Sequence, residues 1–95
     1  MRPDNHIWVF LGSRGTPSGV FTTIDKAQAW IQGNRLSGTL TALPVDESCF
    51  DWAVRLDVTN LKPEKLATKQ DDPDFIANFL TASLEHYHYD GGKRS

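Results

Sequence analysis

The spacing of apolar and polar residues changes several times along the first half of the chain, and each change predicts a different element. Residues 6–11 are a continuous run of β-favouring residues, which indicates a central strand covered on both faces. Residues 12–19 are almost all glycine, serine, threonine and proline, which is typical of a turn. β character resumes at 20–22, so we expect a hairpin with a long loop.

A helical spacing begins directly after this second strand. The predicted apolar face is formed by Ile24, Ala27, Trp30 and Ile31. Thr22 or Thr23 can cap the helix, and Gly33-Asn34 can end it because both residues tolerate the left-handed conformation. Residues 37–43 then alternate threonine with leucine and alanine, as a half-buried strand does, and Pro44 ends this strand.

The segment 48–57 fits two patterns equally well. As a helix, it presents one apolar face made of Cys49, Trp52, Ala53 and Leu56. As a strand, it alternates polar residues with Phe50, Trp52, Val54, Leu56 and Val58. We favour the helix, because Asp46-Glu47-Ser48 is a better helix start than strand start.

The second half of the chain contains one further predicted helix. Residues 59–70 form a polar connection around Pro63. Asp72-Pro73-Asp74 combines an N-cap, a proline at the first helical position and an acid in the first turn. The apolar positions 75, 76, 79, 80 and 84 continue one face, so we expect a helix over 73–85.

These elements assemble into a small α+β domain. A right-handed crossover places the third strand beside the first, which predicts a three-stranded antiparallel sheet of order 2-1-3 packed against two or three helices. Ninety-five residues leave room for one core. We therefore expect a single domain over residues 1–95, with an ordered core from about 5 to 90 and short flexible termini.

Charge and hydropathy exclude two classes of partner. Ten Lys and Arg against twelve Asp and Glu give a net charge of −2, with no basic stripe, so we expect no nucleic-acid binding. No apolar run approaches the ~20 residues of a membrane span, and the start of the chain does not resemble a signal peptide. We expect a small soluble, cytoplasmic protein that contacts no membrane. The lone Cys49 is interpreted as a small core residue.

The most unusual segment is residues 85–90, which combine two of the three histidines and both tyrosines between two acids. If the segment is extended, His86, His88 and Asp90 point to one face and are candidate metal ligands, which His6 or another acid could join. If the segment is helical, His86 and Asp90 lie one helical turn apart. A usable zinc site needs three protein ligands that converge. We favour histidines that face water or bond the backbone, so no metal and no cofactor are expected. The candidate binding residues are His86, Tyr87, His88, Tyr89 and, at the tip of the 12–19 loop, Arg14.

Short motifs spread over nearly the whole chain identify a family resemblance. They are Ile7-Trp8-Val9-Phe10, Ser18-Gly19-Val20-Phe21, Ala27 to Trp30, Ser37-Gly38-Thr39-Leu40-Thr41, Pro44-Val45-Asp46, Asp51-Trp52-Ala53 and Glu85-His86-Tyr87-His88-Tyr89. With these motifs the chain resembles a family of small bacterial proteins classed as a domain of unknown function. The resemblance implies a shared fold and brings no activity, substrate or partner.

No recognised catalytic motif joins the serines, histidines and the cysteine, and the 12–19 loop matches no phosphate-binding fingerprint. This favours a non-enzymatic protein over an enzyme. We expect a protein-interaction or accessory module that acts by self-association, as a homodimer, or through a protein partner. The alternative is a small metal-binding protein or metal-dependent enzyme that uses the cluster of His86 and His88.

Overall fold

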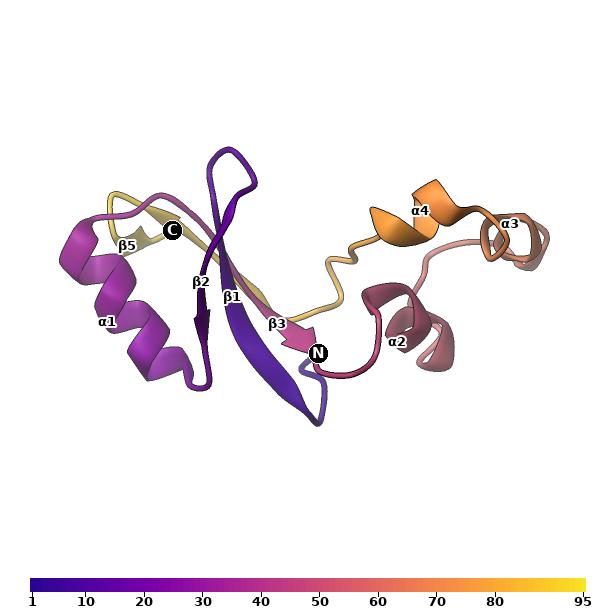
Figure 1. Ribbon diagram of the computed structural model, residues 1–95, viewed down its shortest axis with the longest axis horizontal. Helices are drawn as coiled ribbons and strands as arrows, with labels where there is room; N and C mark the ends of the chain where they lie inside the picture. Colours follow the sequence, from indigo (N-terminus) through magenta and orange to yellow (C-terminus); the bar gives the residue numbers. More distant parts are fainter. The chain divides into compact units, whose positions relative to one another are not determined.

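The computed structural model describes residues 1–95 and contains five strands and four helices. The strands are β1 (His6–Gly12), β2 (Pro17–Phe21), β3 (Gly38–Pro44), β4 (His86–Asp90) and β5 (Lys93–Arg94). The helices are α1 (Ile24–Asn34), α2 (Cys49–Arg55), α3 (Pro63–Lys69) and α4 (Pro73–Ala77). The chain forms two compact units: a sheet unit of Met1–Val45 with Leu84–Ser95, and a helical unit of Asp46–Ser83 (Figure 1).

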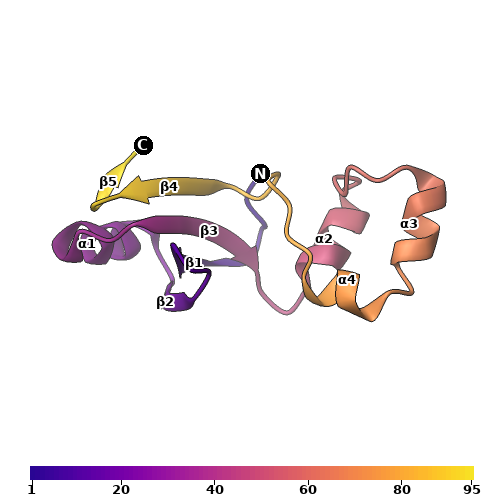
Figure 2. The same ribbon diagram turned by 90° about the horizontal axis from the view of Figure 1, so that it is seen from above.

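The sheet is antiparallel, with strand order β2-β1-β3-β4-β5, so the prediction of a three-stranded sheet is wrong. The two additional strands come from the histidine–tyrosine segment and the residues after it. β4 pairs with β3, placing Tyr87 opposite Leu40 and His86 opposite Thr41 (Figure 2). A turn at Gly91-Gly92, both with positive φ, then returns the chain as β5.

The predicted helix over 73–85 is also wrong in its extent. Its start is correct, because the Asp72 side chain accepts a hydrogen bond from the Phe75 N–H and Pro73 follows it. The helix nevertheless ends at Ala77. The later apolar residues serve other purposes: Leu80 is 52% exposed, whereas Leu84 is fully buried and belongs to the sheet unit. The apolar positions from 75 to 84 thus have helical spacing in the sequence but do not belong to one helix.

The ambiguous segment at 48–57 is the helix α2, as favoured. The Ser48 hydroxyl accepts from the Asp51 N–H at 3.0 Å, which satisfies one of the free donors of the first turn. The helix buries Phe50, Trp52 and Ala53. Unexpectedly, the polar connection predicted at 59–70 contains the helix α3, which begins with Pro63 at its first turn and buries no residue.

In the sheet unit, α1 packs against one face of the sheet. Its N-cap is Thr23, whose hydroxyl accepts from the Lys26 N–H. The buried core consists of Trp8, Phe10, Ala27, Ile31, Leu40, Ala42 and Tyr89. Trp30, expected on the buried face of this helix, is only half-buried and packs at the border of the core against Phe10 and Phe21. No helix is both long enough and apolar enough to span a membrane.

Candidate functional site

β4 distributes the histidine–tyrosine cluster over the two faces of the sheet. Side chains alternate along a strand, so Tyr87 and Tyr89 point to the face that α1 covers. His86 and His88 point to the opposite face, where their ring centroids lie 5.3 Å apart. The residues that the sequence suggested as one binding cluster are therefore two separate groups.

Both tyrosines are held by contacts inside the sheet unit. Tyr89 is 5% exposed, and its hydroxyl accepts a hydrogen bond from Gln28 Nε2 at 3.0 Å. Tyr87 stacks on Trp8, with ring centroids 6.1 Å apart, and donates its hydroxyl to Glu85. The Glu85 carboxylate raises the pKa of Tyr87 because it accepts the phenol proton in this hydrogen bond. These contacts give the tyrosines a structural role.

The histidine pair has local partners and does not complete a metal centre. The Nδ1 atom of His86 lies 2.8 Å from the Leu84 carbonyl, and that of His88 lies 3.2 Å from the Thr39 hydroxyl. Asp90, the third candidate ligand, accepts from the Ser37 hydroxyl. No group of three or more histidine, cysteine, aspartate or glutamate side chains converges as a metal site requires.

Cys49, the only cysteine, lies at the start of α2 as a free thiol. Burial raises the pKa of this thiol, because the thiolate loses solvation. A reactive cysteine needs the opposite shift, toward the thiolate at neutral pH. Cys49 is nevertheless only partly buried, and the buried residues of α2 are Phe50, Trp52 and Ala53, so Cys49 is not the core residue expected from the sequence.

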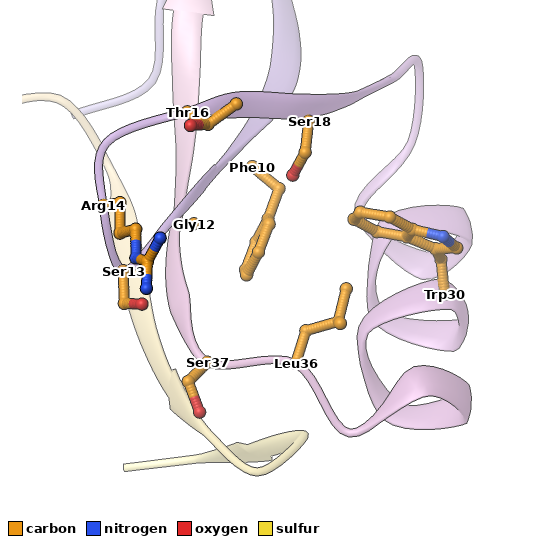
Figure 3. Close-up of a pocket in the computed structure, with 9 residues that line it drawn as sticks. All are labelled: Phe10, Gly12, Ser13, Arg14, Thr16, Ser18, Trp30, Leu36 and Ser37. Atoms are coloured by element: carbon orange, nitrogen blue, oxygen red, sulfur yellow. The ribbon is translucent and has the colours of Figure 1, made fainter.

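Arg14 lies apart from these groups, on the loop between β1 and β2, and lines a pocket of about 390 Å³ (Figure 3). The lining residues are Phe10, Gly12, Ser13, Arg14, Thr16, Ser18, Trp30, Leu36 and Ser37. None of the other four candidate binding residues contributes to it. The loop is tight: the Gly15 N–H donates to the Gly12 carbonyl, and the Gly12 N–H donates to the Thr16 carbonyl. Gly15 has φ of +82°, a conformation that glycine adopts without strain.

The apolar wall of this pocket was not identified from the sequence. Phe10 and Trp30 recur at strand and helix spacing, which indicates core positions, and nothing local marks them as pocket residues. The pocket brings together residues of β1, the β1–β2 loop, α1 and the segment after α1, and the loop with Arg14 lies across the pocket from Trp30 (Figure 3). The sequence pointed only to the polar side of the pocket, through Arg14 in the serine-rich and glycine-rich loop at 12–19.

The two edges of the sheet differ in chemistry. β5 forms one edge with only Lys93 and Arg94. β2 forms the other edge, and no charged residue occurs from Gly15 to Ile24. At the middle of this edge Val20 is 62% exposed, which makes it the most exposed large hydrophobic residue of the chain. The β2 edge is thus an open hydrogen-bonding edge with an apolar side chain.

Comparison with known proteins yields one match. A family model described as a domain of unknown function, DUF7710, covers residues 7–95. Neither the curated proteins nor the solved structures contain a significant match. The predicted resemblance to a domain of unknown function is confirmed, and the chain belongs to the DUF7710 family.

Proposed function

We propose that this domain is a non-enzymatic protein-interaction module that pairs with a second copy of itself through strand β2. The observation that carries the proposal is the β2 edge, where unpaired backbone groups, the absence of charge and the exposed Val20 coincide. The sequence supports the same class of function, because it contains no recognised catalytic constellation.

Protein sheets commonly protect their edges from pairing with other chains by short strands, charged side chains or bulges. β5 uses two of these devices, since it has two residues and both are cationic. β2 has five residues and no charge; it begins with Pro17, and its irregularity lies at Ser18, the extra residue between the Leu11–Pro17 and Phe10–Gly19 pairs. From Gly19 to Phe21 the outer side of β2 is regular and carries no such protection, which supports its use as a pairing surface.

A second copy suits this edge better than a charged partner segment. Antiparallel pairing of two identical strands about a two-fold axis is self-complementary in its hydrogen bonds, because each strand offers the other the same pattern. Such pairing places the beginning of one β2 beside the end of the other.

The proposal is tested with a matched pair of substitutions, Val20→Lys on the β2 edge and Val54→Lys on α2, where Val54 is also exposed. Light scattering coupled to size-exclusion chromatography is measured over a range of protein concentrations. We expect the unsubstituted protein and Val54→Lys to form dimers, and Val20→Lys to stay monomeric at every concentration, because each lysine would bring a charge to the pairing edge. Thermal unfolding of both variants verifies that they fold.

Hydrogen exchange separates edge pairing from other dimers. Amides of Ser18–Phe21 that point away from β1 should become protected as the protein concentration rises, since pairing gives them acceptors. A monomer at all concentrations would overturn the proposal and leave only a different protein as the partner of this edge. A dimer that survives Val20→Lys without protection at β2 would overturn it equally.

A further inference from the structure

We infer that the pocket beside Arg14 binds a small organic anion that carries an aromatic ring, with the ring against Trp30 and the anionic group at Arg14. The inference is independent of pairing through β2, because the pocket lies between the β1–β2 loop and α1, on the face that α1 covers. It rests on the positions of Arg14 and Trp30 at opposite sides of the pocket (Figure 3).

The apolar part of the pocket is a preformed aromatic wall. Phe10 is 2% exposed, and its ring meets the Trp30 ring edge to face at a centroid distance of 5.6 Å. Phe21 supports Trp30 from the other side, at 5.4 Å. Gly19 packs so closely there that an added Cβ would lie 3.0 Å from the Trp30 ring. Trp30 is therefore fixed in place, and its uncovered part, together with Leu36, offers a flat apolar surface to a ring.

The polar part of the pocket contains several side chains without a hydrogen-bond partner; the exception is Ser37, whose hydroxyl donates to Asp90 and accepts from the Gly91 N–H. The Arg14 guanidinium makes no hydrogen bond and no ion pair within the chain. Hydroxyl groups of Ser13, Thr16 and Ser18 border the same pocket, and no aspartate or glutamate lines it. A guanidinium presents its N–H groups as a planar fork that matches carboxylate and phosphate oxygens. Without a competing carboxylate, this fork is available to an anionic ligand.

The size of the pocket limits the ligand. Its volume of about 390 Å³ is near the lower end of the ~300–1,000 Å³ of small-molecule sites. One ring with one short acidic side chain fits this volume. Figure 3 shows Arg14 and Ser13 on one side and Trp30 and Leu36 on the other, with Phe10 between them. A ligand with an apolar end and an anionic end can therefore meet both groups at once, whereas a neutral ring uses only one of them.

The test uses the full chain and four probes: phenylacetate, phenyl phosphate, neutral benzyl alcohol and inorganic phosphate. Binding is followed by backbone amide and indole N–H chemical shifts in NMR titrations. Both aromatic anions should shift residues 12–18 and the Trp30 indole in a saturable way. Benzyl alcohol lacks the charge-assisted hydrogen bonds to Arg14, and inorganic phosphate lacks the ring that packs against Trp30. Each should therefore bind about tenfold or more weakly than the aromatic anions.

Two charge-removing variants make the test specific. Arg14→Gln should weaken both aromatic anions by about tenfold or more and leave benzyl alcohol unchanged. Arg35→Gln removes a guanidinium from a second concavity of about 510 Å³, which Lys93 and Arg94 also line, and should leave all affinities unchanged. The inference is overturned if both variants weaken the binding of the aromatic anions equally. It is also overturned if benzyl alcohol and phenylacetate bind with equal affinity, or if no saturable shift occurs at residues 12–18.

Discussion

Arg2 and Glu85, at opposite ends of the sequence, form a two-point ion pair. The Nε and Nη2 atoms of Arg2 lie 3.0 and 2.8 Å from the two carboxylate oxygens of Glu85. The same carboxylate accepts the hydroxyl of Tyr87, and the Arg2 guanidinium lies 5.1 Å from the Trp8 ring. This network connects the N-terminal segment to the residues that lead into β4.

The network predicts a specific acid sensitivity. Hydrogen bonds from Arg2 and then from Tyr87 lower the pKa of Glu85 from 4.5 to about 2. A lowered pKa in the folded state means that the ionised carboxylate stabilises the fold fully above pH 4.5, and that this contribution is lost as the pH falls from 4.5 toward 2. Glu85→Gln should therefore lower the melting temperature at pH 7, and its difference from the unsubstituted protein should vanish near pH 2. Calorimetry across this range measures both curves.

Arg2→Gln provides the control, because it removes the larger cause of the shift and keeps the carboxylate. The melting temperature of Arg2→Gln should therefore depend much less on pH in this range than that of the unsubstituted protein. Curves for all three proteins that stay parallel from pH 7 to pH 2 would show that the ion pair does not act in solution.

Two glycine substitutions should act in opposite directions. At Gly38, a Cβ would lie 2.2 Å from the Leu11 carbonyl oxygen and 2.7 Å from the Phe10 ring, so Gly38→Ala should destabilise by about 1–3 kcal/mol or more. At Gly33, inside α1, a Cβ meets nothing within 4 Å, so Gly33→Ala should stabilise by about 0.5–1 kcal/mol. Urea unfolding measures both changes. Equal effects of the two substitutions would contradict the close packing of β3 against β1 at Gly38.

The expectation of a single domain over 1–95 leads to a test of cooperativity. The helical unit, residues 46–83, is close to the size of about 40 residues below which chains rarely fold without disulfides or metals. We therefore propose that it unfolds together with the sheet unit. Leu40 in the sheet and Trp52 in α2 are both fully buried. We expect Leu40→Ala and Trp52→Ala each to lower the free energy of unfolding by about 2–5 kcal/mol.

NMR signals from each unit, followed through thermal unfolding, decide between the possibilities. One cooperative domain requires that either substitution lowers the midpoint of both sets of signals equally. Two separate transitions, each shifted by only one substitution, would show that the units fold independently.

The histidine face predicts no response to chelators. His86 and His88 bond to a backbone carbonyl and a threonine, and no third ligand joins them. Thermal unfolding with and without EDTA should give the same midpoint. EDTA should likewise leave the midpoint of the double variant His86→Ala, His88→Ala unchanged. The prediction is contradicted if the purified protein contains stoichiometric zinc and the double variant loses both this zinc and thermal stability.

Local chemistry in the sequence determined where most helices begin. The caps at Thr23, Ser48 and Asp72 connect a side chain to a backbone N–H three residues later, so a short window contains both partners. For the segment at 85–90 the sequence left an extended and a helical conformation open. The sequence could not predict that this segment is a strand of the sheet, because a strand requires a pairing partner from elsewhere in the chain.

The tertiary structure alone decided which residues belong together. β4 exists because β3 supplies its hydrogen-bond partners, and this pairing sends the tyrosines to the core and the histidines to the other face. The pocket likewise joins Arg14 of a loop to Trp30 of α1. Periodicity reports which face of an element is apolar, but it does not encode which distant element covers that face. For this reason the sequence pointed to a single histidine–tyrosine site, whereas the fold separates its members and places Arg14 beside an aromatic wall.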